Sequence, residues 1–389
     1  MKITLLGLEF ALENLGCQAL AYSFANEISN IMLELGVESE YTAVVFAASS
    51  DIKIPDSGQK VDCLKIRYKS LAFWRDLRKL FSASDLIVDF TGGDSFSDIY
   101  GKKRFFMATF IKLMAIKSKA TFVLGPQTYG PYQRKMVRKL ASRVIRKSDY
   151  VFARDRVSGE LAEKLSKRSV CIAPDVAFAL PYDKDAYKKD GQKINIGINP
   201  SGLLWNGGYS HAKLPLTVEY QKYCNSLLDA LCNEPKYQIH LITHVGTKNG
   251  GGVESDYSVC CSLHDKYPQT ILVDVFSTPM DAKTYISTMD VLVGARMHAT
   301  IAAFSSGVAT IPFSYSRKFE GLYSGIGYNN VIHACTEETG EAVRKTLKYI
   351  QEYCFVKQQV VDSMKQVALL QDDFRNELKG IVKTVTDKL

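Results

Sequence analysis

Short apolar runs alternate with amphipathic stretches along most of the chain. Each run has the length and composition of a buried strand, and each stretch repeats apolar residues at helical spacing. This alternation is typical of a parallel sheet with helices on both faces. In the first part of the chain the predicted strands are 3–8, 41–47, 86–90, 121–124 and 150–153, and the predicted helices are 19–35, 74–81, 103–117 and 133–146.

The alternation stops near Pro181. The stretch from Tyr182 to Lys193 is charged and poor in aliphatic residues, as in a linker. The alternation then restarts, with strands predicted at 194–198, 238–243, 270–275, 291–293 and 309–313, and helices at 218–232, 284–289 and 299–306. The last part is mostly helical, with a break predicted near Asp372-Asp373.

These patterns predict an α/β protein with two doubly wound domains that face each other across a cleft. The predicted organisation is a first domain at 1–181, a linker at 182–193, a second domain at 194–340 and C-terminal helices at 341–389 that pack back on the first domain. A chain of 389 residues is long enough to form two domains.

The net charge of +8 is concentrated in one segment. Residues 99–148 contain 13 basic residues and no acidic one, whereas the remaining chain has 36 basic and 41 acidic residues. Phe105, Phe106, Phe110 and Met114 interleave with these cations, which suggests loose docking on anionic lipid or on a lipid-diphosphate carrier. The alternative is a pair of ordinary solvated helix faces, and no nucleic-acid-binding module accompanies the segment.

Nine cysteines are scattered without a C-x-x-C pair, which indicates neither a metal site nor a disulfide framework and fits a reducing cytosol. The first residues read as a strand rather than a secretory signal, and no apolar run approaches the roughly 18 residues of a transmembrane helix. We therefore expect a cytoplasmic protein, with contact to the inner face of the plasma membrane left open.

The stretch from Val291 to Gly321 holds the strongest candidate site. Arg296 and His298 follow one strand end and precede a helix of small residues, and Lys318 follows the next strand end. Ligands bind at the carboxyl ends of strands in open α/β sheets, and a helix N-terminus beside cations favours an anion. The sequence predicts an anion site with acid–base capacity; the alternative is a surface arginine and a histidine that caps the helix.

Other predicted strand ends also carry polar loops. In the first half they contain Asn14 and Gly16, Gly92-Gly93-Asp94, Gln127 within the turn 125–131, and Arg154; in the second half His244 ends a strand. Taken singly, each loop also fits an ordinary turn or helix cap. The run 250–252 lacks the lysine of a phosphate-binding loop, and there is no H-E-x-x-H, G-x-S-x-G, G-x-G-x-x-G or clustered metal-ligand set, so neither a metal nor a nicotinamide cofactor is expected.

Taken in order, these motifs resemble the polysaccharide pyruvyl transferase family. The resemblance is strongest at Gly294-Ala295-Arg296-Met297-His298-Ala299, Gly307-Val308, Tyr315 and Lys318, and weaker landmarks are Gly92-Gly93, Gly130-Pro131 and Arg154-Asp155 with Ser158. Two positions depart from the family pattern: Cys17 follows Gly16 where an acid is usual, and Asp94 stands where a third glycine is common.

The resemblance implies two Rossmann-like domains arranged as in GT-B glycosyltransferases. It also implies transfer of the enolpyruvyl group of phosphoenolpyruvate, as co-substrate, onto a sugar of a bacterial surface polysaccharide or its lipid-linked precursor, with phosphate release. Arg296, Arg154 and Lys318 would hold the anionic groups of the donor. His298 is our candidate for proton transfer and His244 a second one, while Tyr315, Asn14, Gly16, Gly92, Gly93, Asp94 and Gln127 are predicted to bind substrate.

Two other functions remain open from the sequence. A GT-B glycosyltransferase that uses a nucleotide sugar often grips the ribose with a carboxylate, for which Glu320 is the only nearby candidate. A non-catalytic scaffold of a glycan-assembly complex, held at the membrane by the basic segment, is the other.

Overall fold

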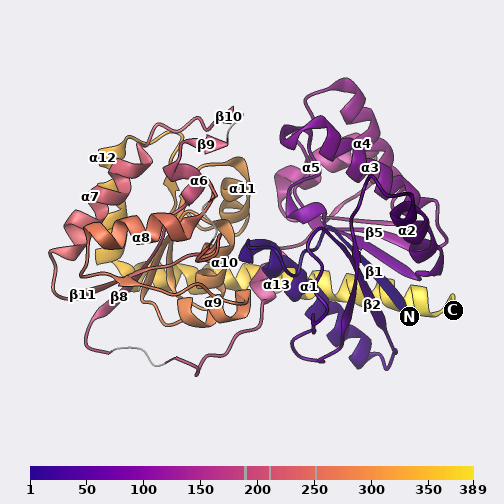
Figure 1. Ribbon diagram of the computed structural model, residues 1–389, viewed down its shortest axis with the longest axis horizontal. Helices are drawn as coiled ribbons and strands as arrows, with labels where there is room; N and C mark the ends of the chain where they lie inside the picture. Colours follow the sequence, from indigo (N-terminus) through magenta and orange to yellow (C-terminus); the bar gives the residue numbers. More distant parts are fainter. Residues whose placement is uncertain (188–190, 210–211, 250–251) are drawn as a thin grey trace. The chain divides into compact units, whose positions relative to one another are not determined.

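The computed structural model of the chain describes residues 1–187, 191–209, 212–249 and 252–389. The chain forms two compact units, each with its own sheet (Figure 1). Unit 1 comprises Met1–Leu12, Leu20–Ala179 and Ala368–Leu389, and unit 2 comprises Glu13–Ala19 and Leu180–Val367.

Unit 1 contains a seven-stranded, all-parallel sheet with the order β3-β2-β1-β4-β5-β6-β7. The order reverses between β1 and β4, which is the switch point of a doubly wound sheet. The strands are β1 (Lys2–Leu6), β2 (Glu40–Val45), β3 (Val61–Lys65), β4 (Leu86–Asp89), β5 (Thr121–Gln127), β6 (Tyr150–Ala153) and β7 (Cys171–Ile172).

Helices cover both faces of this sheet. One layer is formed by α2 (Leu71–Ala83), α3 (Lys102–Ile116), α4 (Lys135–Lys147) and α5 (Arg156–Ser166), which contact one another in this order. Side chains such as Phe73, Phe105 and Val144 from this layer join the sheet residues in one hydrophobic core. Elsewhere in unit 1, the final helix α13 (Tyr353–Thr386) packs Phe374 edge-on against Phe152 of β6.

Unit 2 repeats the doubly wound pattern with six parallel strands in the order β12-β11-β8-β13-β14-β15. Its switch point lies between β8 and β13. The strands are β8 (Ile194–Asn199), β11 (Tyr237–Leu241), β12 (Ile271–Leu272), β13 (Val291–Gly294), β14 (Ala309–Ser314) and β15 (Ile332–His333), with a small hairpin of β9 (Gly208–Tyr209) and β10 (Ala212–Lys213). The helices are α6 (Gly202–Trp205), α7 (Tyr220–Cys232), α8 (Asp256–Lys266), α9 (Pro279–Ile286), α10 (Met297–Ser305), α11 (Arg317–Gly325) and α12 (Thr339–Gln351).

Some boundaries differ from those predicted. Helix α1 (Leu15–Glu34) begins at Leu15, and its first turn belongs to unit 2, although the sequence placed Asn14 and Gly16 in the first domain. The predicted break at Asp372-Asp373 is wrong, because α13 continues through it; the helix boundary lies near Glu352. Parts of the predicted linker 182–193 and of the run 250–252 lie outside the described residues.

No helix in the described part of the chain is long and apolar enough to cross a membrane.

Candidate functional site

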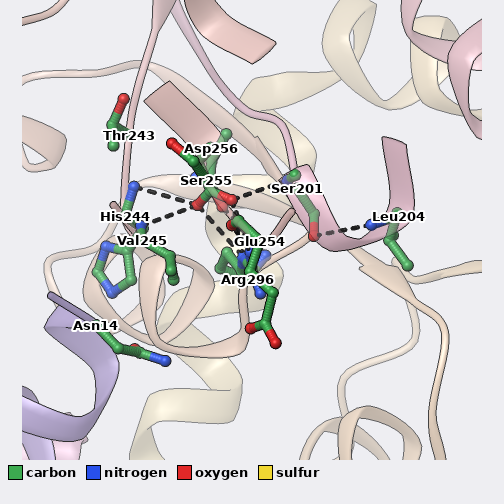
Figure 2. A network of polar contacts seen from close by, with 12 residues as sticks. Asn14, Ser201, Leu204, Thr243, His244, Val245, Glu254, Ser255, Asp256 and Arg296 are labelled. Carbon is green, nitrogen blue, oxygen red and sulfur yellow. Dashed lines mark hydrogen bonds and ion pairs between the residues drawn. The ribbon is translucent and has the colours of Figure 1, made fainter. Parts of the chain in front are cut away.

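The candidate site of unit 2 is built around Asp256, a fully buried carboxylate at the start of α8 (Figure 2). Its Oδ2 accepts hydrogen bonds from the backbone N–H groups of His244 at 3.3 Å and Val245 at 3.0 Å, and its Oδ1 accepts one from Gly202 at 2.9 Å. Asp256 therefore ties together the ends of two neighbouring strands, because 244–245 follow β11 and Gly202 follows β8.

Arg296 supplies the counterion of Asp256. Its Nε and Nη2 donate to Oδ1 of Asp256 at 3.0 and 2.8 Å, and Nη2 also donates to the Glu254 carbonyl at 2.7 Å. Burial lowers the pKa of the guanidinium, but the ion pair with Asp256 outweighs it and raises the pKa overall, so Arg296 stays charged. Of its three nitrogens only Nη1 has no protein partner among the residues described, and this atom remains for a ligand.

Asn199 fixes the backbone at the switch point. Its Oδ1 accepts from the Arg296 backbone N–H at 3.1 Å, and its Nδ2 donates to the Ile242 carbonyl at 2.9 Å. The side chain thus joins the carboxyl ends of β8, β11 and β13. A polar residue that closes the apolar run 194–198 was the available sequence signal for Asn199, and we did not predict it.

The loop that begins with Glu13 joins the same site. Asn14 forms an antiparallel bridge with Val245, and the Leu15 N–H donates to the His244 carbonyl at 3.2 Å. The Asn14 side chain accepts from the Gly16 N–H at 3.0 Å, which caps the start of α1. Figure 2 shows Asn14 and the His244 imidazole on the same side of the Asp256 network.

Gly16 lies directly against the imidazole of His298. A Cβ built on Gly16 would lie 2.3 Å from Nδ1 and 2.9 Å from Cγ of His298. His298 itself lies in the first turn of α10, two residues after Arg296. The structure therefore brings together five residues predicted from the sequence, namely Asn14, Gly16, His244, Arg296 and His298.

Replacing Gly16 by alanine is expected to reduce turnover by up to about a hundredfold, because the added methyl would displace His298, our candidate for proton transfer, by about an ångström. Steady-state kinetics of the purified variant measures this loss. The matched control is Gly380→Ala in α13, where a Cβ meets nothing within 4 Å; it should leave activity unchanged and add about 0.5–1 kcal/mol of stability. Full activity of the Gly16→Ala variant would show that the position of His298 does not matter.

His244 is buried, and neither ring nitrogen has a hydrogen-bond partner within the described ranges. Burial, followed by the nearby His298 and Arg296, lowers its pKa to about 3. The imidazole is therefore neutral near pH 7. It can donate or accept one hydrogen bond to a ligand, and it is poorly suited to act as a general acid.

This lowered pKa predicts a loss of stability in acid. Below pH 6.5 the imidazole is protonated in the unfolded chain, whereas in the native protein it stays neutral down to about pH 3. The stability that the neutral His244 contributes is therefore complete above pH 6.5 and is lost as the pH falls. At pH 5 the loss should be about 2 kcal/mol. The free energy of unfolding of His244→Phe, measured in urea, should depend less on pH than that of wild type, whereas the half-buried control His333→Asn should behave as wild type does. Equal pH dependence in the two variants would refute the assignment.

The next strand end carries further polar groups. The hydroxyls of Ser314, at the end of β14, and Ser316, which precedes α11, are buried without a partner in the described structure. Tyr315, between them in sequence, is buried and lies near the guanidinium of Arg296. Lys318 lies half-buried in the first turn of α11. Glu320, the acid considered for ribose binding, is exposed and lies 3.7 Å from His333.

A second cluster lies at the strand ends of unit 1. Arg154 follows β6, and its Nη1 binds Asp175 at 3.0 Å while Nε donates to Thr128 at 2.7 Å. A Cβ on Gly93 would lie 3.2 Å from the Nη1 of Arg154, and Gly92 and Gly93 both have positive φ. The structure therefore brings Gly93 and Arg154 together.

Two buried atoms of this cluster face no partner. Neither the Nη2 of Arg154 nor the Oε1 of Gln127 has a hydrogen-bond partner among the described residues. The amide nitrogen of Gln127 is held by the Asp89 carbonyl at 2.9 Å. Asp94 accepts a hydrogen bond from the Tyr100 hydroxyl at 2.8 Å.

Besides Asn199, the sequence did not identify two further residues of these clusters. Asp256 reads as an ordinary residue at a helix start, and Asp175 lies 21 positions from its partner Arg154. Only the folded chain shows that they contact predicted residues. Among the residues that the structure describes, no three His, Cys, Asp or Glu side chains gather as metal ligands.

Comparisons with known proteins agree on fold and family. The amylovoran biosynthesis protein AmsJ of Erwinia amylovora is 21% identical over 296 residues, which cover 72% of this chain and 69% of that protein. Among solved structures, UDP-GlcNAc 2-epimerase from Neisseria meningitidis, bound to UDP-GlcNAc, matches over the full length of both chains with a TM-score of 0.58 and 13% identity. Sucrose-phosphate synthase from Thermosynechococcus elongatus also matches over both full lengths, with a TM-score of 0.59 and 9% identity.

At these identities the structural likenesses show the fold alone, which is the pair of Rossmann-like domains found in GT-B glycosyltransferases and related epimerases. The sequence of residues 31–317 matches the family described as polysaccharide pyruvyl transferase. Because this match spans most of the chain, the protein belongs to the polysaccharide pyruvyl transferase family.

Proposed function

We propose that this transferase moves the enolpyruvyl group of phosphoenolpyruvate onto a sugar of a surface polysaccharide or its lipid-linked precursor, as a cyclic ketal, and releases phosphate. The family supports the transferred group, and the relative named for amylovoran biosynthesis supports a polysaccharide acceptor. The observation that carries the proposal is the fixed position of His298 against Gly16, beside Arg296 and the neutral His244.

The proposed reaction is balanced without a further reactant. Two sugar hydroxyl oxygens form bonds to the central carbon of the donor, and the bond from that carbon to the phosphate oxygen breaks. One hydroxyl proton is matched by the proton gained at the methylene carbon, which becomes a methyl group. The other leaves with the phosphate. The chemistry calls for anion binding and proton transfer, and we propose no cofactor besides the co-substrate phosphoenolpyruvate.

Unit 2 has groups suited to this donor. The free Nη1 of Arg296, the backbone N–H groups at the start of α10 and the side chain of Lys318 can bind the carboxylate and phosphate. Tyr315 and the Ser314 and Ser316 hydroxyls can add hydrogen bonds. In this proposal His298 delivers the proton to the methylene carbon, and His244 donates a hydrogen bond as a neutral imidazole.

We propose that the sugar acceptor binds at the cluster of unit 1. A sugar hydroxyl both donates and accepts hydrogen bonds, which suits the unpartnered Nη2 of Arg154 and Oε1 of Gln127. Buried polar atoms without partners are costly, so a ligand or water is expected at each of them. Gly92 and Gly93 both have positive φ, a backbone conformation that glycine adopts readily.

The proposal is tested by incubating the protein with phosphoenolpyruvate and a panel of lipid-linked sugars. We expect phosphate release that requires an acceptor, together with an acceptor whose mass has increased by one pyruvyl ketal. Thermal unfolding with phosphoenolpyruvate or with nucleotide sugars separates the alternatives, because a bound ligand raises the apparent stability. Stabilisation by a nucleotide sugar alone, without phosphate release from phosphoenolpyruvate, would favour a glycosyltransferase instead.

A further inference from the structure

A row of aromatic rings lies exposed on unit 1. It runs from Phe46, after β2, through Tyr68, after β3, to Trp74 on α2 and Phe110 on α3. Neighbouring ring centroids are 6.0, 6.1 and 5.3 Å apart, and the Trp74 indole donates to the Tyr68 carbonyl at 2.9 Å. The ring contacts hold four side chains from separate segments in one continuous apolar surface.

Several side chains of this surface are largely exposed. Leu71, which begins α2, is 87% exposed, and Phe46 and Phe110 are each 51% exposed. Single exposed apolar residues are common, but a contiguous group marks a site of interaction. Trp74 packs against the core of unit 1 with its partly buried side, whereas Phe46, Leu71 and Phe110 are not part of that core.

Cations surround the rings at helical spacing. On α3, Lys103, Phe106, Phe110 and Lys117 follow one another at intervals of three, four and seven residues, which places them on one face. On α2, Leu71, Trp74 and Arg78 are spaced in the same way. The two helices contact each other through Trp74 and Phe110, so the two stripes lie side by side.

The charge of this layer is strongly positive. Of the 13 basic residues in 99–148, all but Lys112 are exposed; Lys112 is buried and pairs with Asp89 at 2.7 Å. Asp98 is bound to Arg134 and Asp76 to Arg75, and the nearby Glu9 is buried and accepts hydrogen bonds from the backbone N–H groups of Phe46 and Ala47. A partner for this face must therefore be anionic and must also accept apolar side chains.

We propose that the face formed by α2, α3 and the adjoining loops docks on the surface of an anionic lipid bilayer. Aromatic side chains favour the headgroup level, where one part of the ring contacts acyl chains and the other contacts water. The exposed lysines and arginines bind the lipid phosphates, each contributing through the negative surface potential. A nucleic acid could bind the cations but has no apolar surface in which to bury Leu71, which is why the bilayer is favoured.

Vesicle flotation at low salt tests this inference with the full chain. Wild type should float with vesicles of phosphatidylcholine and phosphatidylglycerol, and much less with phosphatidylcholine alone. Lys102→Gln with Lys103→Gln and Lys117→Gln should weaken binding on the order of a hundredfold, since each cation is worth about fivefold. Leu71→Ser with Phe110→Ser should weaken it by about tenfold or more.

Matched controls come from α13, where Phe355 and Leu369 are 61% and 60% exposed. Phe355→Ser with Leu369→Ser, and Lys357→Gln with Lys365→Gln and Lys383→Gln, should bind as wild type does. The inference is overturned if wild type binds neither vesicle, if the α13 variants weaken binding equally, if Leu71→Ser with Phe110→Ser has no effect, or if an RNA duplex binds in place of vesicles. Phosphate release with a water-soluble acceptor should be unchanged in the docking variants, which separates this inference from the proposed function.

Discussion

Replacing His298 by alanine is expected to lower kcat by about 10²–10⁴-fold, with a much smaller change in the KM for phosphoenolpyruvate. The proposed reaction adds a proton to carbon, a step that a positioned acid accelerates and a bulk-water proton does not. The imidazole is held by Gly16 on one side and by the first turn of α10, so its position is set before the donor binds. Loss of the ring removes the proposed proton donor but leaves the proposed anion-binding groups in place.

Phosphate release under saturating phosphoenolpyruvate measures this effect. His264→Ala is the matched control, because His264 is a half-buried histidine of α8 that contacts only Thr270 among the described hydrogen bonds, and it should retain wild-type kcat. In a variant that already carries His298→Ala, adding Gly16→Ala should cause no further loss of kcat, since both changes act through the contact between Gly16 and His298. A His298→Ala enzyme with a raised KM and normal kcat would make His298 a binding residue only.

Most elements of the fold were predictable because of how parallel sheets are buried. A strand covered on both faces is a continuous apolar run, so β1, β4, β13 and β14 were identified within a few residues. Edge strands lack this signal. The sequence VDCLK of β3 carries a charge at the second and the last position, and only its pairing with β2 makes it a strand. The acid pair Asp372-Asp373 was taken for a break, yet exposed aspartates cost a long helix little.

The site was predictable where it depends on strand ends and not where it depends on distant pairing. Arg296 and His298 follow a recognisable strand, and their position at a switch point follows from the fold. The partner of Arg296 lies 40 residues earlier, in a Ser-Asp pair that looks like any helix start. For the same reason the sequence did not predict that Asn14 belongs to unit 2. Its bridge with Val245 joins residues far apart in sequence and places the first loop in that unit.

Replacing Arg296 by alanine is expected to destabilise unit 2 by about 3–5 kcal/mol, because Asp256 would remain buried without its counterion. The sequence alone predicts a loss of donor binding from this change. The ion pair adds a structural cost, since its side chains are 10% and 0% exposed and Asp256 connects the ends of β8 and β11. Urea unfolding at pH 7 measures the difference, and the exposed pair of Arg75 and Asp76 provides the control. Arg75→Ala should change the stability by less than about 1 kcal/mol.

A double variant separates the two roles of Arg296. If the cost of Arg296→Ala comes from the uncompensated carboxylate, adding Asp256→Asn should recover part of the stability, because a neutral amide needs no counterion. Donor binding should not recover, since Nη1 is still absent. Thermal shifts with phosphoenolpyruvate therefore ought to remain small in both the single and the double variant. Restored stability together with a normal shift would mean that Arg296 holds Asp256 and nothing else, and the donor anion would then have to be bound by Lys318 and the start of α10.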